Sequence, residues 1–419
     1  MKRVVTGLLV LVVLAVVGFL TVGARIADGR MNTVVSTTLP VVSPVASALH
    51  RRLFVADLHA DQLLWGRDLL ARASRGHVDV PRLQEGHVAL QVFSVVTKTP
   101  RGMNYDQNTG ETDNVLLLAI AQRWPRATWT SLRARAVYQA DQLRDAVLRS
   151  ANTLTLITTR EEMAAFVERR AGDPAQVSAL LAIEGLHALD GTLESVDTLY
   201  AAGFRMMGLT HFFDNEVAAS AHGVTHAGLT PLGRQVVARM EALGIIVDLA
   251  HASSQTVQEV LAMATRPVVV SHTGVAATCP GPRNLTDDQL RAIAANGGLV
   301  GIGYWDGAVC EPTVANIVKA IQHAVQVAGV AHVALGSDFD GATRTPFDTR
   351  GMAAITDGLL TAGLDQNSIA RVMGGNTRDF LLRQLPSSLP PTSRSTGTSG
   401  HPFRRRPTNR LALLAATRH

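Results

Sequence analysis

Residues 245–303 decide the fold, because three short apolar runs alternate there with two longer segments: IIVDLAH (245–251), VVVSH (268–272) and LVGIG (299–303). Short, almost continuously apolar runs are typical of parallel strands buried on both faces. The segments between them, 254–265 and 287–296, have the length of helices, and Thr286 with Gln289 forms a capping-box pattern before the second. The stretch therefore predicts an α/β fold with a parallel sheet.

The same alternation extends over most of the chain and predicts eight strands. They are residues 54–59, 89–96, 179–184, 204–211, 245–251, 268–272, 299–303 and 332–338. Helix-compatible stretches lie between most of them, including 232–243 and 314–328. No glycine-rich dinucleotide-binding fingerprint follows an early strand. We therefore expect a closed (β/α)8 barrel of the TIM type rather than an open doubly wound sheet.

Composition divides the chain into four regions. We expect an N-terminal membrane segment at 1–30, a spacer at 31–52, the barrel at 53–384 and a flexible tail rich in Pro, Ser and Arg at 385–419. A long insertion, 97–158, follows the second predicted strand and contains a helical piece at 132–148. Insertions after barrel strands lie on the active-site side, so this one is expected to cover the site.

The N-terminal segment predicts export. Lys2 and Arg3 precede an apolar run, 4–24, that is long enough to span a bilayer. Positive charge before the run favours a cytoplasmic N-terminus and a barrel on the periplasmic or extracellular face. Val22-Gly23-Ala24 also fits a small-residue cleavage site, so an uncleaved anchor and a removed signal peptide both stay open.

The charge of the chain does not indicate a nucleic-acid partner. The formal net charge is +5, and the arginines of the tail alone match this excess. No basic stripe with interleaved aromatic residues occurs, so nucleic-acid binding is not expected. Oligomeric state stays open, with a homodimer among the alternatives.

Two cysteines, Cys279 and Cys310, are present and lie about one β/α unit apart. In an exported chain two cysteines can pair, and a metal-binding pair would need closer spacing and more partners. A disulfide is expected, with two free buried thiols as the alternative.

Six of the eight predicted strands end in polar residues that can bind a metal or a substrate. These ends are DLHAD (57–61), EG (184–185), TH (210–211), DLAH (248–251), SH (271–272) and SDFD (337–340). In a barrel the carboxyl ends of all strands converge on one rim, so these side chains would face a common centre. Polar ends on six strands are hard to place in a core without a shared role.

The ligand types at this rim predict a zinc centre. Several histidines with several carboxylates suit Zn²⁺ and are too rich in nitrogen for Ca²⁺ or Mg²⁺. His59 and Asp61 lie two apart, so both can project to the same side of a strand and bind one ion. His251 and His272 come from adjacent strands and can bind a second ion, with Glu184 placed to bridge the two. Such a pair holds a hydroxide that is nucleophilic near neutral pH.

Other polar residues near these motifs receive weaker expectations. Asp57 and Asp248 are expected to support ligands or cap strand ends rather than bind metal. His222 and His226 lie in a polar loop and are expected at the surface or rim. For His187, a contact with the site and a structural role are equally supported.

Taken in order, the motifs resemble the membrane dipeptidase (renal dipeptidase) family. They are DLHAD (57–61), IEGLHAL (183–189), LTH followed by N (209–215), VDLAH (247–251), VVSHTG followed by PRN (269–284) and GSDFDG (336–341). The resemblance covers nearly the whole barrel. It implies two zinc ions per chain, with the ligands His59, Asp61, Glu184, His251 and His272, and with Glu184 bridging.

The resemblance also implies roles for substrate-binding and catalytic residues. His211 resembles the histidine that steadies the oxyanion, and Arg283 the clamp on the terminal carboxylate of the substrate. Asp338 resembles the carboxylate that binds the substrate amino group or carries a proton, with Asp340 as its rival. The family cysteine in the position of Cys279 pairs near the next strand, where Cys310 lies. The N-terminal anchor and the long tail depart from the family pattern.

These residues predict hydrolysis of a dipeptide by a metal-bridging hydroxide. Asp338 would pass a proton to the leaving amine, and Arg283 would restrict substrates to those with a free carboxylate near the scissile bond. A related binuclear amidohydrolase acting on lactams or other small amides is the alternative. A metal-stabilised surface binding protein without catalysis is a third interpretation.

Overall fold

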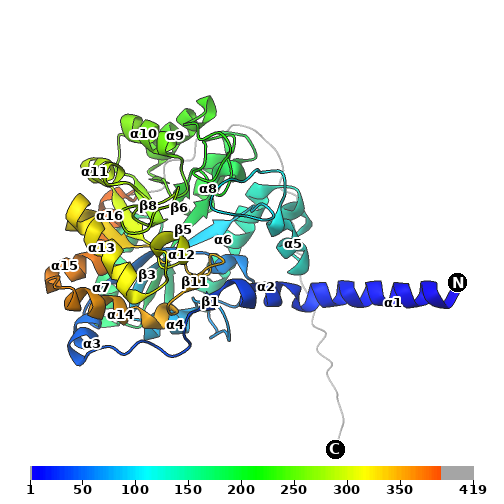
Figure 1. The fold of residues 1–419 in the computed structure, drawn as a ribbon, viewed down its shortest axis with the longest axis horizontal. Helices are drawn as coiled ribbons and strands as arrows, with labels where there is room; N and C mark the ends of the chain where they lie inside the picture. The colour runs from blue at the N-terminus through cyan, green and yellow to red at the C-terminus, as the bar shows by residue number, and fades with distance from the viewer. Residues whose placement is uncertain (1, 388–419) are drawn as a thin grey trace, which may run out of the picture. The chain divides into compact units, whose positions relative to one another are not determined.

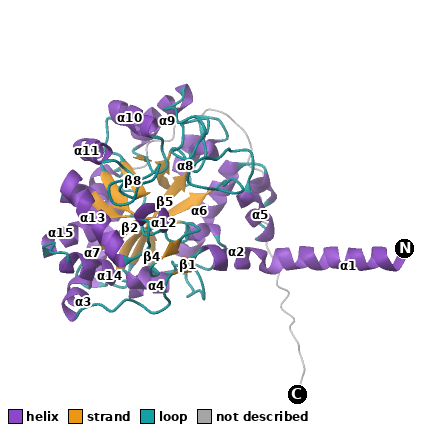
Figure 2. Cartoon of the chain, in the orientation of Figure 1, coloured by secondary structure: helices purple, strands orange, loops and turns teal. Residues whose placement is uncertain are grey.

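Eight parallel strands close into a barrel in the computed structural model, which describes residues 2–387 (Figures 1 and 2). The strands are β2 (Val55–Ala60), β3 (Val88–Val96), β5 (Val177–Glu184), β6 (Phe204–Gly208), β7 (Ile246–Asp248), β8 (Val269–Thr273), β9 (Leu299–Ile302) and β10 (Val333–Leu335). Their order is β3-β2-β10-β9-β8-β7-β6-β5, and pairing of β3 with β5 closes the ring. The predicted (β/α)8 barrel and all eight predicted strands are confirmed.

Side chains that alternate along the strands belong to two different apolar clusters, and the same alternation determines which way Glu184 points. In β5, Leu180 and Ala182 belong to one cluster, while Leu181 and Ile183 belong to the other, which includes residues of the surrounding helices. Successive strand side chains point to opposite faces, so Glu184 lies on the same face as Leu180 and Ala182. It is the last residue of β5, and its carboxylate therefore stands at the carboxyl-end mouth of the barrel.

Helices surround the barrel (Figure 2). The predicted ones are present as α6 (Leu132–Arg149), α9 (Pro231–Leu243), α10 (Ser254–Met263), α11 (Asp287–Ala295) and α13 (Val314–Ala328). The others are α3 (Pro44–His50), α4 (Val80–Glu85), α5 (Asn114–Ala121), α7 (Arg160–Gly172), α8 (Ser195–Ala201), α12 (Asp306–Val309), α14 (Ala353–Thr361), α15 (Gln366–Ala370) and α16 (Asn376–Gln384). The predicted capping box of Thr286 and Gln289 starts α11.

The N-terminal segment forms one continuous helix, from Arg3 to Met31, made of α1 (Lys2–Gly18), η1 (Phe19–Gly23) and α2 (Ala24–Met31). It is long and apolar enough to cross a membrane, and its apolar part is exposed. In Figure 1, α1 stands clear of the barrel. The length matches the predicted membrane segment.

Residues 31–52 are more than the expected spacer, because they pack onto the barrel. Strand β1 (Thr33–Val34) pairs with β11 (Arg344–Thr345), which follows the last barrel strand. The short helix α3 starts at Ser43, whose side chain accepts a hydrogen bond from the backbone of Ala46, and it contacts α14. The composition of 31–52 predicted only a spacer, and it does not indicate these contacts with β11 and α14. The predicted tail beyond residue 387 lies outside the described residues.

The insertion after β3 carries α5, α6 and the short strand β4 (Leu154–Leu156), which adds to β5. Cys279 and Cys310 form a disulfide, with their Cα atoms 5.5 Å apart. This confirms the predicted pair. It ties the loop after β8, which carries Arg283, to the end of α12.

Candidate metal centre and substrate pocket

Seven predicted site residues meet at the mouth of the barrel. His59, Glu184 and His272 lie within β2, β5 and β8. Asp61 directly follows β2, while His211, His251 and Asp338 each lie three residues beyond the ends of β6, β7 and β10. All seven side chains are buried. Strand ends set up this convergence, because the barrel brings together residues that are far apart in sequence.

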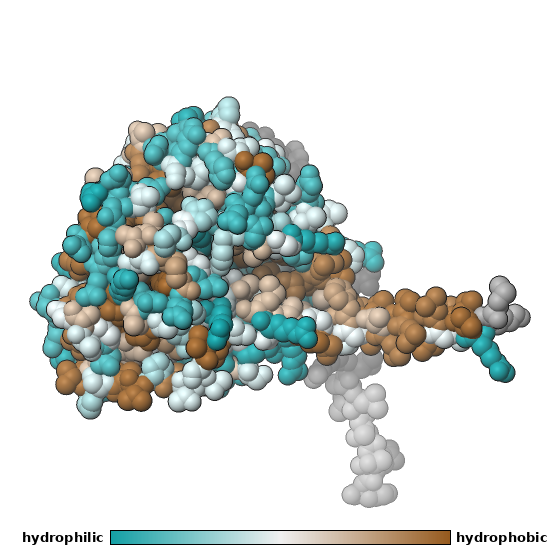
Figure 3. Space-filling view, viewed as in Figure 1, coloured by the Kyte–Doolittle hydropathy of each residue, from teal (hydrophilic) through white to brown (hydrophobic). Residues whose placement is uncertain are grey.

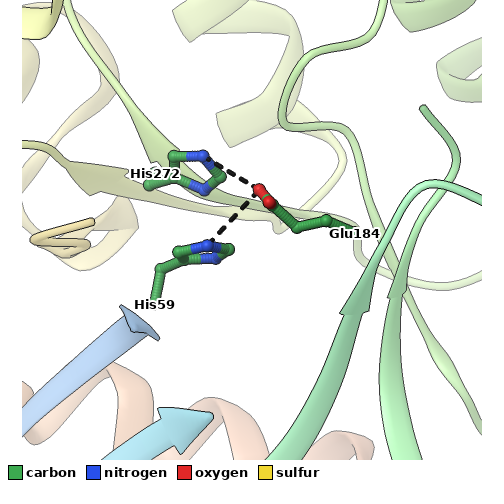
Figure 4. A group of neighbouring side chains, drawn as sticks. All are labelled: His59, Glu184 and His272. Carbon is green, nitrogen blue, oxygen red and sulfur yellow. Dashed lines mark ion pairs between the residues drawn. The ribbon is translucent and has the colours of Figure 1, made fainter. Parts of the chain in front are cut away.

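The Glu184 carboxylate lies at the centre of the histidines. Its Oε1 atom is 3.3 Å from Nε2 of His59 and 3.2 Å from Nε2 of His272 (Figure 4). The same oxygen is 3.2 Å from Nε2 of His251, and Oε2 is 3.1 Å from Nε2 of His211. Glu184 can therefore take part in two ligand groups at once, as a bridging carboxylate does.

Asp61 and Asp338 complete the group on the other side of His59. The Nε2 atom of His59 is 3.4 Å from Oδ1 of Asp61 and 3.9 Å from Oδ1 of Asp338. Three sets of side chains thus bring their ligand atoms within 4.8 Å of one another: His59, Glu184 and His272; Glu184, His211 and His251; and His59, Asp61 and Asp338. Each of the three groups could hold a metal ion, and every ligand atom comes from a buried side chain.

The buried polar atoms fit a cation. His59 Nε2, Asp61 Oδ1 and Glu184 Oε1 have no hydrogen-bond partner among residues 2–387. A buried donor or acceptor without a partner costs free energy, and a metal ion would satisfy all three at once. Burial also lowers the pKa values of His211, His251 and His272 well below the usual range, so their imidazoles are neutral, which is the form that binds metal.

Ser271 orients two of these histidines. Its Oγ atom is 2.9 Å from Nδ1 of His272 and 3.3 Å from Nδ1 of His59. A hydroxyl has two lone pairs, so it can accept a hydrogen bond from both rings when their Nδ1 atoms carry the proton. This leaves the Nε2 atoms unprotonated and directed at the centre, as in metal sites where a neighbouring group fixes the imidazole tautomer.

Asp57 and Asp248 accept hydrogen bonds from backbone amides and belong to none of the three groups of ligand atoms, as expected. Asp57 accepts hydrogen bonds from the backbone and hydroxyl of Ser337. Asp248 accepts from the backbone amides of Ala250 and Ser271. Each carboxylate thereby positions a segment that carries a site residue.

The structure separates Asp338 from its rival Asp340. Asp340 accepts hydrogen bonds from the backbone amides of His77 and Val78 and forms an ion pair with Arg67 at 2.7 Å. Asp338 instead lines the cavity, and burial raises its pKa to about 8. Its φ of 59° lies in the left-handed region, which is strained for a side-chain-bearing residue and common at functional sites.

Arg283 lines the pocket. Its guanidinium lies over the ring of Trp305, with Cζ 4.7 Å from the ring centroid, and Nη2 donates to the carbonyl of His272 at 2.8 Å. The Nε atom is buried without a partner among the described residues. A planar guanidinium held in this way can bind a carboxylate through two hydrogen bonds.

His222 lies at the rim of the barrel and not at the surface, which was the other predicted position. It is fully buried, and its ring stacks on Phe212 and lies 5.5 Å from the ring of His251. Its Nδ1 atom is 2.6 Å from the carbonyl oxygen of Tyr105, which belongs to the insertion after β3. A polar loop carries no periodic pattern, so nothing in the sequence indicated that the insertion would cover it. His226 is exposed as expected.

His187 has a structural position beside the site. Its ring lies 4.8 Å from that of Phe213, and neither ring nitrogen has a hydrogen-bond partner among the described residues. Burial lowers its pKa to about 3. His187 belongs to none of the three groups around Glu184.

A cavity of about 600 Å³ opens over the centre. Its polar lining includes Asp61, Glu184, His211, His251, His272, Arg283 and Asp338. The insertion after β3 contributes Tyr105 and the apolar helix α5, as expected for a long loop on this side of the barrel. The cavity therefore presents an arginine, a group of metal ligands and a carboxylate to one small molecule.

Comparison with known proteins agrees with this geometry. Residues 44–382 match the membrane dipeptidase family, peptidase family M19. The chain is 29% identical over 376 residues to dipeptidase aclJ of Aspergillus oryzae, covering 83% of each chain. It is 31% identical over 307 residues to dipeptidase verJ of Clonostachys rogersoniana, covering 72% of this chain and 74% of the relative.

Solved structures share the fold. A metallo peptidase from Rhodobacter sphaeroides, liganded with a phosphinate mimic of the dipeptide L-Ala-D-Ala, has a TM-score of 0.67 at 22% identity, over 79% of this chain and 99% of that one. The probable dipeptidase PvdM from Pseudomonas aeruginosa has a TM-score of 0.67 at 19% identity, over 81% and 97%. The match over most of the barrel shows that the chain belongs to the membrane dipeptidase family, peptidase family M19.

Proposed function

We propose that this metallo-dipeptidase hydrolyses dipeptides with two zinc ions held by His59, Asp61, Glu184, His251 and His272. The observation that carries the proposal is the position of Glu184, whose carboxylate oxygens lie 3.1–3.3 Å from the Nε2 atoms of four histidines. When bound, such ions supply Lewis acidity and lower the pKa of water held between them toward neutrality. Imidazole and carboxylate donors in this proportion suit zinc.

His211 is proposed to steady the negative charge that develops on the scissile carbonyl oxygen. Its imidazole is buried and lines the cavity beside Glu184. A preorganised donor in a water-poor site stabilises such charge far better than bulk water does. Because burial keeps this imidazole neutral, it would act as a hydrogen-bond donor and not as a cation.

Arg283 and Asp338 are proposed to hold the two ends of the substrate. Arg283 would bind the terminal carboxylate, and Asp338 would bind the amino group or carry the proton to the leaving amine. A raised pKa suits Asp338 to proton transfer near neutral pH. With both ends of the molecule bound in one cavity, a dipeptide fits better than a longer peptide.

The N-terminal helix is proposed to anchor the enzyme in a membrane, with the barrel on the outer face. Its length, apolar composition and exposure support an uncleaved anchor. Lys2 and Arg3 before the apolar run support a cytoplasmic N-terminus. A homodimer stays a prediction.

The proposal is tested on the full chain purified in detergent. Bound metal is measured, and a panel of dipeptides is assayed with and without a chelator, alongside lactams and other small amides. We expect about two zinc ions per chain and chelator-sensitive hydrolysis of dipeptides. Hydrolysis of lactams or amides alone would favour the alternative amidohydrolase, and activity that survives complete metal removal would overturn the mechanism.

A further inference from the structure

The N-terminal helix forms part of the wall of the catalytic cavity. Phe19 and Gly23 of η1, and Ala24, Ala27 and Met31 of α2, line the same cavity as Glu184 and Asp338. A helix that only tethers a domain does not need to contact the active site. Here the carboxyl-terminal part of the N-terminal helix lines the substrate pocket.

The end of this helix is fastened to the loop that carries Asp338. Asp28 of α2 is fully buried and accepts from Arg75 at 2.6 Å. It also pairs with Arg67 at 3.2 Å, and Arg67 in turn pairs with Asp340 at 2.7 Å. Arg67 therefore links Asp28 of the helix to Asp340, which lies two residues beyond Asp338. Removing one partner of such a buried pair would leave an uncompensated charge, so the three side chains depend on one another.

Hydrogen bonds extend the same connection. The side chain of Asn32 donates to Asp28 at 2.9 Å and accepts from the backbone amide of Ala342 at 2.9 Å. The hydroxyl of Thr343 donates to the carbonyl of Asp338 at 2.7 Å. The helix is thus attached to the segment that carries Asp338.

Helix α5 adds a second apolar element beside the N-terminal helix. Its sequence is NVLLLAIA, and it contacts η1. Leu117 and Leu118 line the cavity, and Leu117 is 41% exposed. Figure 3 shows hydrophobic surface continuing from the N-terminal helix onto the adjoining part of the barrel domain. Together, η1, α2 and α5 form an apolar wall of the cavity. Metal binding does not require this wall.

The anchor places this wall at the bilayer. About 20 helical residues span the hydrocarbon core, so a membrane span that starts near Arg3 ends near η1. Apolar side chains of η1 and α5 would then lie at the outer membrane surface, next to the mouth of the cavity. A substrate with an apolar group would concentrate at that surface.

We propose that the enzyme selects dipeptides whose amino-terminal residue carries a large apolar side chain, which lies along η1, α2 and α5. The inference rests on the proposed dipeptidase function, in which Asp338 marks the amino end of the substrate and Arg283 its carboxyl end. Burial of the side chain against the apolar wall supplies the selectivity, since each methylene placed in an apolar pocket is worth about tenfold or more in kcat/KM.

The test compares two exposed leucines on neighbouring helices of one insertion. Leu117 lines the cavity, whereas Leu148 of α6 is 84% exposed and does not line it. Full-length wild type, Leu117→Glu and Leu148→Glu are assayed in detergent with Phe-Ala and Ala-Ala, and thermal unfolding verifies that each variant is folded.

We expect wild type to prefer Phe-Ala, and the ratio of kcat/KM for Phe-Ala over Ala-Ala to fall about tenfold in Leu117→Glu. The ratio in Leu148→Glu should equal that of wild type. An unchanged ratio in Leu117→Glu, or an equal fall in both variants, would overturn the inference while leaving the dipeptidase function intact. Hydrolysis of neither dipeptide by wild type would count against the dipeptidase function itself and remove the basis of the inference.

Discussion

The Nε2 atoms of His251 and His272 lie 3.0 Å apart, and each is 3.2 Å from the same oxygen of Glu184. Two neutral imidazoles at this distance can share only one proton, and both rings are buried. A cation between them and the carboxylate would satisfy all three groups. Their close approach fits a site that binds a metal ion.

Metal removal should destabilise the fold. Chelation would leave the carboxylate of Glu184 buried without a counter-charge and the neutral imidazoles of His251 and His272 without their ligand, so the melting temperature should fall by several degrees and return when zinc is added back. Thermal unfolding in detergent, with and without chelator, measures the effect. An identical melting temperature in both conditions, with metal loss verified, would contradict a structural contribution of the metal.

Glu184→Gln should abolish activity while the protein still folds. The amide keeps the shape of the side chain but removes the negative charge that Glu184 contributes to two groups of ligands. We expect kcat/KM to fall more than about 100-fold, which exceeds the usual effect of losing a residue that only supports a ligand. Turnover of a dipeptide and bound metal are measured together. Glu259→Gln, at a half-buried ion pair on α10 outside the three ligand groups, serves as the control and should keep wild-type turnover. Near-normal turnover of Glu184→Gln with metal bound would exclude the mechanism.

Arg283→Lys should weaken selection for a free carboxylate. Lysine keeps the charge but loses the planar pair of donors, so kcat/KM for a dipeptide should fall about 10- to 100-fold, corresponding to a charge-assisted hydrogen bond of about 1.5–3 kcal/mol. The same substrate with an amidated carboxyl end provides the control, since it should be hydrolysed poorly by both proteins. Equal losses on the free and amidated substrates would argue for a packing role on Trp305.

Ser271→Ala should weaken metal binding and leave the ligands in place. Ser271 contacts Nδ1 of both His59 and His272, and removing such a supporting group costs about 10- to 100-fold in metal affinity. Zinc titration of the apoprotein measures the change. Ser94→Ala is a matched control, because Ser94 is a buried strand serine outside the three ligand groups. Affinities that are the same in both variants would show that Ser271 does not orient the histidines.

Acidification should destabilise the fold through His50, which belongs to none of the three groups of ligand atoms. His50 is buried between the Thr356 hydroxyl and the Gly86 carbonyl, and burial lowers its pKa from 6.5 to about 4. The unfolded chain therefore binds the proton first as pH falls. Stability is full above pH 6.5 and decreases by about 3 kcal/mol as pH falls to 4.

Denaturant unfolding of wild type and His50→Gln at several pH values isolates this contribution. The stability difference between the two proteins should shrink as pH falls from 7 to 4.5. His226→Gln, at an exposed position, should show a constant difference from wild type. A constant difference for His50→Gln as well would mean that His50 titrates normally in the folded protein.

The local pattern of the sequence determined the barrel and most of the centre. Apolar runs buried on both faces, such as Val268–His272, can be read without tertiary information, and parallel strands must present their carboxyl ends at one rim. That rule alone brought His59, Glu184 and His272 together. The disulfide was predicted from the two cysteines together with an apolar run, 4–24, that is long enough to span a bilayer.

The tertiary structure decided what depends on contacts between distant segments. His222 is buried because the insertion carrying Tyr105 covers its loop, and residues 31–52 are ordered because they find partners on the barrel. Asp338 and Asp340 are equivalent candidates in the sequence. In the structure, Arg67 and the backbone amide of His77 bind Asp340, whereas Asp338 lines the cavity. The N-terminal helix is held beside the cavity by the ion pairs of Asp28 with Arg67 and Arg75, and periodicity does not identify such a residue. Periodicity reports which face of an element is apolar, whereas burial and ion pairing depend on what packs against that face.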